Sequence, residues 1–283
     1  MEQPLKIDAL VPREMAQRAE YVGASKAEMD TPTMFSLAVL AGAFISLGAV
    51  FATTVAAGGG IPYGLSRVLT GLVFCLGLIL VIVAGAELFT GNNLIVMAWA
   101  AGKVSTWALL RNWAIVYLGN FVGALGTVVF VFLAKQYTFG PAGSEIGRTA
   151  LAIATAKCEL DFVQAVASGI MCNAMVCLAV WLTFSARTTT DKILAILFPI
   201  TGFVAAGFEH SVANMYFIGR GLLIKEAATE WVAAHAADLD LSALTTHNFL
   251  LKNLLPVTLG NIIGGAVLVA LVYWFVYLRP RRI

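Results

Sequence analysis

The sequence predicts an all-α integral membrane protein in which six transmembrane helices form an inverted repeat of three plus three. Composition is the first indication, because 60% of the 283 residues are hydrophobic and only 12% are charged, whereas about 25% of a soluble domain is charged. The second is a set of six apolar segments, each long enough to cross a hydrocarbon core of about 30 Å. The third is a polar motif that interrupts two of these segments.

Residues 1–30 are polar and mixed in charge, and we expect them to form a segment separate from a membrane domain of residues 31–283. Their start lacks the basic and then apolar pattern of a cleaved signal peptide. Met15 and Ala19 are spaced like one face of a helix, and Pro12 suits its first turn. The segment is therefore either an amphipathic helix or a frayed terminal arm.

The apolar segments fill most of the remaining chain, and two of them, the second and the fifth, contain the polar motif. The predicted spans are Met34 to Ala57, Leu65 to Ala100, Trp107 to Ala134, Asp161 to Ser185, Ile193 to about Ile218, and Phe249 to Leu278. They give two repeat halves, at about 34–134 and 161–278. The second span is too long for one straight crossing, which is a further sign that it is broken.

The distribution of lysine and arginine predicts the orientation. If both termini lie on one side, that side carries eleven of these residues and the opposite side seven. The positive-inside rule then places both termini in the cytoplasm. The eleven are Lys6, Arg13, Arg18, Lys26, Lys103, Arg111, Arg187, Lys192, Arg279, Arg281 and Arg282.

Two sequence patterns support the repeat. Ala-Gly-x-Glu followed five residues later by Asn occurs at 84–92 and at 206–214, and Leu-Gly-Asn-x-x-Gly-small occurs at 118–124 and at 259–265. Three spans per copy is an odd number, so the second copy enters the membrane from the opposite face. Such an inverted repeat brings its two breaks together near the midplane, where transport sites lie.

The breaks are expected to line a cavity, because irregular backbone at membrane depth needs protein or water around it. Gly85 and Gly207 permit turns that a side chain would obstruct. Thr90 and Ser211 follow the breaks, where a new half-helix begins and offers a hydroxyl for capping or for a ligand. The N-terminus of a half-helix carries partial positive charge, so the sequence predicts a site that suits an anion.

The polar residues of the two motifs are expected to have different tasks. Glu87 and Glu209 are interpreted as scaffold that accepts backbone N–H bonds, because a bare carboxylate would repel an anion. His210 has no polar counterpart, since the first copy has Leu88 at that position. An imidazole can donate a hydrogen bond or a proton near neutral pH, so we expect His210 to face the pore rather than serve only as a core residue.

The other polar and aromatic candidates leave two interpretations open. The in-membrane amides are expected to form interhelical hydrogen bonds, with Asn173 as the one most suited to approach His210. Bulky apolar side chains flank the breaks and form either hydrophobic constrictions or ordinary packing. Lys157, placed in an external loop, is either a solvated charge or an attractor of anions. The amides are Asn92, Asn120, Asn173, Asn214 and Asn261, and the apolar residues are Phe74, Leu78, Leu88 and Phe203.

Several other classes of protein fit the sequence less well. A net charge of +2 is too small to indicate binding to nucleic acid. A water or glycerol channel would share the inverted repeat, but the Asn-Pro-Ala of such breaks is missing. A membrane metalloenzyme would need more imidazoles or paired carboxylates than Glu87, Glu209 and His210 provide. We therefore expect no metal, no cofactor and no catalysed covalent chemistry.

Four sequence stretches together resemble the formate/nitrite transporter family over nearly the whole chain. They are Ala-Gly-Ala-Glu-Leu-Phe-Thr at 84–90, Asn-Ala-Met-Val-Cys-Leu-Ala-Val-Trp at 173–181, Ala-Gly-Phe-Glu-His-Ser-Val-Ala-Asn at 206–214 and Pro-Val-Thr-Leu-Gly-Asn-Ile-Ile-Gly-Gly at 256–265. The resemblance implies six-helix protomers with an aquaporin-like fold, assembled into homopentamers in the bacterial inner membrane. Each protomer would carry its own pore for a small monovalent anion.

The resemblance also implies roles for individual residues. Thr90 and His210 correspond to a central selectivity pair, and Lys157 to a residue of the outer vestibule. Because an imidazole can give up a proton near neutral pH, we also expect pH-dependent gating or proton transfer at this pair. The N-terminal segment corresponds to one that gates the pore from the cytoplasm. The remaining correspondences are Phe74, Leu78, Leu88 and Phe203 for the constrictions and Glu209, Asn173, Asn214 and Asn261, with Glu87 in the other copy, for a polar network.

The anion itself is predicted less sharply by the same resemblance. The Leu-Phe-Thr-Gly after Glu87 is similar to nitrite-transporting members of the family. The long linker between spans five and six and the turn at 61–64 are similar to formate-transporting members. Formate is therefore the first expectation, with nitrite or hydrosulfide as the alternatives.

Overall fold

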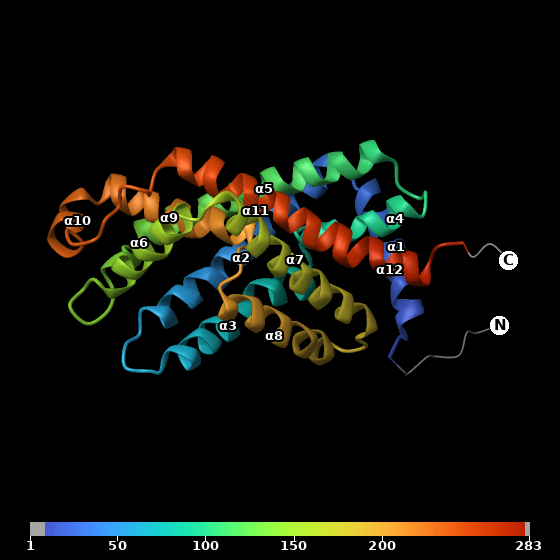
Figure 1. Cartoon of the computed structure of the whole chain (residues 1–283), viewed down its shortest axis with the longest axis horizontal. Coiled ribbons are helices and arrows are strands. Elements are labelled where there is room, and N and C mark those ends of the chain that lie inside the picture. Colours follow the sequence, from blue (N-terminus) through green and yellow to red (C-terminus); the bar gives the residue numbers. More distant parts are fainter. Residues whose placement is uncertain (1–8, 281–283) are drawn as a thin grey trace.

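A computed structural model describes residues 9–280 and confirms the predicted fold class. The described residues are helical without any strand, and six helices are long and apolar enough to cross a membrane. Lys6, Arg281 and Arg282 of the charge count lie outside the described residues. Helices α1 and α12 lie at one end of the elongated molecule, and α6 and α10 at the other (Figure 1).

The spans begin and end close to the predicted residues, except that the fifth continues to Ala227 and not to about Ile218, and the second and fifth are interrupted as expected. Three of the intact spans are single helices, α2 (Thr31–Ala56), α5 (Thr106–Leu133) and α7 (Phe162–Ser185). The sixth span, Asn248–Tyr277, is one continuous run of η4 (Asn248–Leu254), α11 (Leu255–Ile262), η5 (Ile263–Leu271) and α12 (Val272–Tyr277). The second span consists of α3 (Tyr63–Ile79) and η1 (Leu80–Gly85) before its break, and of η2 (Gly91–Ile95) and α4 (Val96–Ala100) after it. The fifth span consists of α8 (Thr189–Ala206) before its break and α9 (Ser211–Ala227) after it.

Helices outside the spans extend the repeat. Within residues 9–280, α1 (Pro12–Glu28) precedes the first half and α6 (Glu145–Cys158) precedes the second, and two short helices, η3 (Gln136–Thr138) and α10 (Thr229–His235), also lie outside the spans. The placement of Lys157 in a loop was wrong, because it lies in the last turn of α6. The α6 sequence is too polar to read as a span, although the fold places it as the counterpart of α1.

A third duplicated pattern shows that α1 and α6 correspond. Lys-x-Glu-x-Asp occurs at 26–30 and at 157–161. In each copy the Asp caps the following span: Asp30 accepts a hydrogen bond from the backbone N–H of Thr33, and Asp161 from that of Gln164. The repeat unit is therefore an amphipathic helix followed by three spans.

Glycines let the first and third span of each half cross closely. A Cβ atom on Gly123 of α5 would overlap the carbonyl oxygen of Val39 in α2, and one on Gly264 would overlap that of Ile170 in α7. Small residues at such crossings allow backbones to approach each other, which drives helix association in a membrane. Tyr117 and Thr258, which occupy equivalent positions, share a 3.0 Å hydrogen bond and so mark the pseudo-two-fold axis.

Gly123→Ala is expected to destabilise the protein, because the added methyl group must push α5 away from α2. Overpacking of this kind costs about 1–3 kcal/mol. Gly126→Ala is the matched control, since Gly126 lies on the same helix with nothing within 4 Å of an added Cβ. Thermal unfolding of the detergent-solubilised variants checks this, and equal melting temperatures for the two would contradict the proposed crossing.

Candidate functional site

The two breaks have the same backbone geometry. Gly85 ends η1 with φ +85°, and Gly207 ends α8 with φ +81°, a left-handed conformation that side chains other than glycine rarely adopt. The residue after each glycine still donates its N–H to the preceding helix, Ala86 to Val81 and Phe208 to Phe203, but the backbone groups beyond it have no helical partners. Each break therefore needs hydrogen bonds from elsewhere.

One asparagine from the third span of each half supplies two of these bonds. Asn120 accepts from the N–H of Phe89 at 2.9 Å and donates to the carbonyl of Glu87 at 2.9 Å. Asn261 accepts from the N–H of Ser211 at 2.9 Å and donates to the carbonyl of Glu209 at 3.0 Å. Both amides are fully buried. The equivalent bonds show that the two amides hold the two loops in the same way.

The two carboxylates sit in equivalent polar clusters. Glu209 accepts from the Lys157 ammonium at 2.7 Å and from Asn214 at 2.6 Å, and Asn214 also donates to Asn253 at 2.8 Å. These donors are side chains, not the backbone N–H groups expected from the sequence. The carboxylate is thus neutralised and fixed in place, and it presents no bare negative charge.

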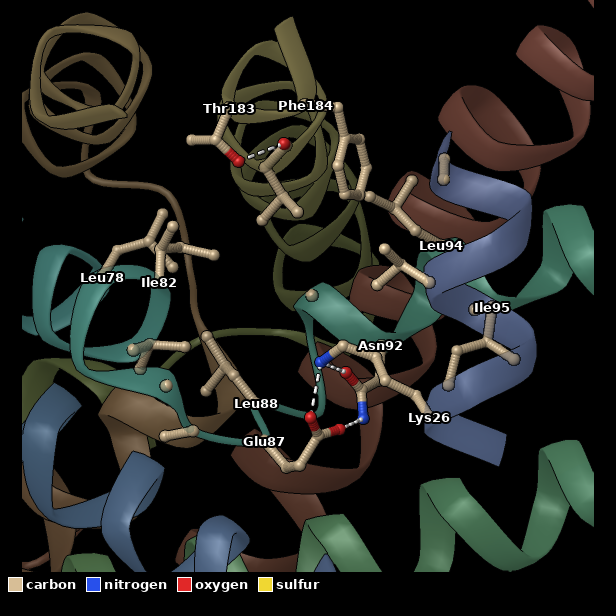
Figure 2. A pocket seen from close by; sticks show the side chains of 18 of the residues that line it. Lys26, Leu78, Ile82, Glu87, Leu88, Asn92, Leu94, Ile95, Thr183 and Phe184 are labelled. Carbon is tan, nitrogen blue, oxygen red and sulfur yellow. Dashed lines mark hydrogen bonds and ion pairs between the residues drawn. The ribbon is translucent and has the colours of Figure 1, made fainter. Parts of the chain in front are cut away.

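The first copy repeats this arrangement with its own residues. Glu87 accepts from the Lys26 ammonium at 2.7 Å and from Asn92 at 2.7 Å (Figure 2). Asn92 also donates to Asn112 at 3.0 Å. Lys26 comes from α1, so the helix before the first span closes this cluster. The sequence reasoning did not single out Lys26 for a site role.

Lys26, Asn112 and Asn253 are the site residues that the sequence reasoning missed. The signals were present, because Lys26 and Lys157 are related by the pattern at 26–30 and 157–161. Asn112 and Asn253 have the same separation in sequence as Asn120 and Asn261. The separation of 141 residues between Asn120 and Asn261 also relates Asn112 to Asn253, whereas Lys26 and Lys157 are 131 residues apart and are related only by the Lys-x-Glu-x-Asp pattern.

Two cavities open toward the breaks from opposite ends. The Glu87 cavity has a volume of about 370 Å³, and its lining includes Leu78, Leu88 and Glu87 (Figure 2). The Glu209 cavity has a volume of about 300 Å³, and its lining includes Phe74, Phe203, Glu209 and His210. The charged groups are Arg18, Lys26, Glu87 and Lys192 in the first cavity, and Arg67, Lys157 and Glu209 in the second. Positive groups outnumber negative ones in both.

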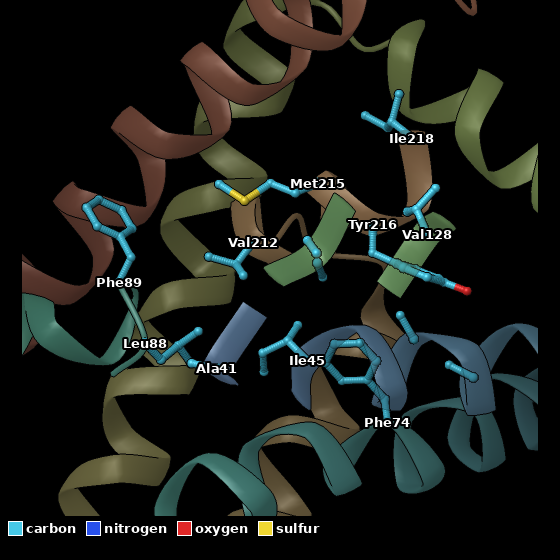
Figure 3. Packing of buried hydrophobic residues seen from close by; sticks show 14 of the residues in the cluster. Ala41, Ile45, Phe74, Leu88, Phe89, Val128, Val212, Met215, Tyr216 and Ile218 are labelled. Carbon is cyan, nitrogen blue, oxygen red and sulfur yellow. The ribbon is translucent and has the colours of Figure 1, made fainter. Parts of the chain in front are cut away.

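Buried apolar side chains separate the cavities. Phe74 and Phe203 meet edge to face with ring centres 5.9 Å apart, and each is only 3% exposed. Leu78 and Leu88 are each 2% exposed, and Figure 3 shows Leu88 and Phe74 within one cluster of apolar residues that also contains Ile45. The structure thus brings the four predicted apolar residues together between the cavities, two lining each.

Thr90 and His210 meet inside this apolar region. The Thr90 hydroxyl oxygen and Nε2 of His210 are 2.9 Å apart, and both residues are buried. Nδ1 of His210 accepts a hydrogen bond from the backbone N–H of Ala213 at 3.0 Å, so the side chain caps α9. A nitrogen that accepts carries no proton. The ring proton is therefore on Nε2, which donates to Thr90 and leaves the Thr90 hydroxyl proton available to another acceptor.

The two copies differ at the positions around this pair. His210 corresponds to Leu88, and Thr90 to Val212. Asn173 donates to the carbonyl of Thr90 at 3.2 Å and to that of Asn261 at 2.7 Å. The scaffold of the breaks is symmetric, whereas the polar groups at the centre come from one copy or the other.

Comparisons with known proteins agree with this geometry. The family model described as formate/nitrite transporter matches residues 13–275. The formate channel FocA of Escherichia coli (strain K12) is 45% identical, with 97% of this chain and 96% of FocA aligned. A probable formate transporter of Methanothermobacter thermautotrophicus is 35% identical over 95% of this chain and 97% of its own. A pentameric formate channel solved with formate bound is 43% identical and superposes with a TM-score of 0.81, covering 88% of this chain and 98% of that one.

Proposed function

The chain belongs to the formate/nitrite transporter family. We propose that its pore carries small monovalent anions and prefers formate among them. The protein is a channel and not an enzyme, because its relatives are channels. The observation that supports the choice of anion is the Thr90 hydroxyl, held by His210 and buried between two cavities that are each rich in positive charge. Nitrite and hydrosulfide rank after formate.

The cavities account for charge selection. Each carries more cationic than carboxylate groups, and an apolar wall around such a cavity focuses the field on an entering anion. The lysine of each carboxylate pair adds no net charge. The excess therefore comes from the remaining arginine and lysine side chains, and it favours anions over cations at both ends of the pore.

The central pair reduces the cost of crossing the apolar region. A small anion that leaves water loses its hydration, and an unpaired charge in an apolar environment is very unfavourable. The Thr90 hydroxyl offers one charge-assisted hydrogen bond at this point, polarised by the Nε2–H of His210 behind it. Transfer of a proton would need a second proton on Nδ1, which would displace the bond from Ala213. We therefore propose donation of a hydrogen bond as the main role of His210, and pH-dependent gating stays a prediction.

The apolar surface of the protomer indicates that lipid or other subunits surround it. Large apolar side chains such as Phe130 and Phe198, 75% and 84% exposed, need lipid or another subunit around them. We propose a homopentamer in the bacterial inner membrane, with both termini in the cytoplasm. Residues 1–30 then form a cytoplasmic segment that can act on the Glu87 cavity, since α1 contributes Arg18 and Lys26 to its lining. The channel domain is residues 31–283.

Currents through planar bilayers test the proposed anion directly. We expect anion-selective currents with formate, nitrite, chloride and hydrosulfide presented in turn, and the highest permeability for formate. A higher permeability for nitrite would reassign the substrate within the family. Reversal potentials that follow the cation gradient would contradict the proposed charge selection.

A further inference from the structure

Arg67 connects the Glu209 cavity to the end of helix α8. It lies in the second turn of α3 and lines the cavity. Its Nε donates to the carbonyl of Ala205 at 3.1 Å, and its Nη2 to the carbonyl of Val204 at 2.6 Å. These carbonyls belong to the last turn of α8, where the ending helix lacks further N–H donors; the Val204 carbonyl accepts from the N–H of Gly207 at 3.1 Å as well as from Arg67. The guanidinium therefore closes the end of α8 at the second break.

The charge of Arg67 is the one that the cavity leaves unbalanced. The charged groups in the lining are Arg67, Lys157 and Glu209. Glu209 forms its ion pair with Lys157 at 2.7 Å, and no carboxylate pairs with Arg67 among residues 9–280. Carbonyl oxygens accept hydrogen bonds from the guanidinium but do not cancel its charge. The positive potential of this cavity therefore comes mainly from Arg67.

The same contacts bear on the width of the constriction. Val204 directly follows Phe203, whose ring packs edge to face on Phe74. Gly207 leaves room for the guanidinium, since a Cβ there would lie 3.2 Å from Nη2 of Arg67. Loss of the two hydrogen bonds from Arg67 to the carbonyls of Val204 and Ala205 would free the last turn of α8, and with it the backbone that carries Phe203.

We propose that Arg67 is a specificity-determining residue of the pore with two effects. Its charge gathers small monovalent anions in the Glu209 cavity, and its two hydrogen bonds to α8 keep Phe203 against Phe74, so that larger carboxylates are excluded. This assignment rests on the proposed function of the pore. It predicts that different substitutions of Arg67 separate the effect of its charge on anion entry from the effect of its hydrogen bonds on the width of the constriction.

The test measures formate and acetate flux into proteoliposomes at low and high ionic strength. Arg67→Met removes both effects, so formate flux at low ionic strength falls about tenfold, the lower end of the range for a focusing cleft, and loses its dependence on salt. Arg67→Lys keeps the charge but not the planar fork, so it keeps the salt dependence while acetate flux rises relative to formate flux. Arg148→Gln is the matched control, because Arg148 is a cation of α6 that lies outside the cavity lining and pairs with Asp238.

Each outcome decides a different point. Salt dependence in Arg67→Met equal to that of the wild type, or an equal loss in Arg148→Gln, would overturn the assignment of the cavity charge to Arg67. An unchanged acetate-to-formate ratio in Arg67→Lys would overturn its effect on the constriction, even if Arg67→Met failed to fold. A wild-type protein with no formate flux above that of empty liposomes would instead overturn the proposed function itself.

Discussion

Glu209→Ala is expected to destabilise the protein by on the order of 3 kcal/mol or more and to abolish anion flux. The substitution leaves the Lys157 ammonium without its partner 2.7 Å away, on a side chain that is only 16% exposed, and an uncompensated buried charge is strongly destabilising. It also leaves Asn214 without the carboxylate to which it donates. Thermal unfolding in detergent and formate uptake by proteoliposomes measure the two losses.

A double variant shows whether the lost charge pair is the cause. Lys157→Met combined with Glu209→Met removes both charges and retains most of the volume, so it should be more stable than Glu209→Ala alone. Glu87→Ala should cost less than Glu209→Ala, because Lys26 is 28% exposed and can turn to water. A double variant as unstable as the single one would contradict the assignment of the loss to an unpaired lysine.

Thr90→Val is expected to lower formate flux by about 10- to 100-fold while the fold is retained. Valine has nearly the shape of threonine but lacks the hydroxyl that we propose meets the anion. A hydrogen bond to a charged group contributes about 1.5–3 kcal/mol, which corresponds to this range of rates. Formate uptake by proteoliposomes of the variant measures the effect.

Thr53→Val is the control for this substitution. Thr53 also lines the Glu209 cavity, but its hydroxyl donates to the carbonyl of Ala49 within its own helix. Its loss should leave formate flux close to that of the wild type. Equal losses in Thr53→Val and Thr90→Val would mean that hydroxyl groups in the pore wall act without regard to position.

The spans were predictable because the thickness of the bilayer fixes their length. The predicted start of the first span at Met34 lies three residues inside α2, which begins at Thr31. Helix α6 was missed because bilayer thickness constrains only helices that cross the membrane, and a helix that does not cross needs no long apolar run. Its Arg148 and Lys157 made the sequence resemble a loop, although the fold uses one face of it to cover α9.

The candidate site was predictable where the sequence repeats itself and not where tertiary contacts decide. Glu209, His210 and Asn214 belong to one motif, so they could be placed together at a break. The donors to the two glutamates could not be identified in that way, because Lys26 comes from a helix before the first span. Arg67 carried no sequence signal, since its partners Val204 and Ala205 are apolar residues that act through their backbone carbonyls.

A double-mutant cycle on Thr90 and His210 tests the central pair most directly. His210→Asn keeps an N-cap for α9, because asparagine is also a favoured capping residue, but its side chain is too short to reach Thr90. If Nε2–H acts on the anion only through the Thr90 hydroxyl, formate conductance of the double variant equals that of Thr90→Val alone. If the double variant instead loses conductance by the product of the two single losses, Thr90 and His210 act independently. That result would contradict the proposed role of His210.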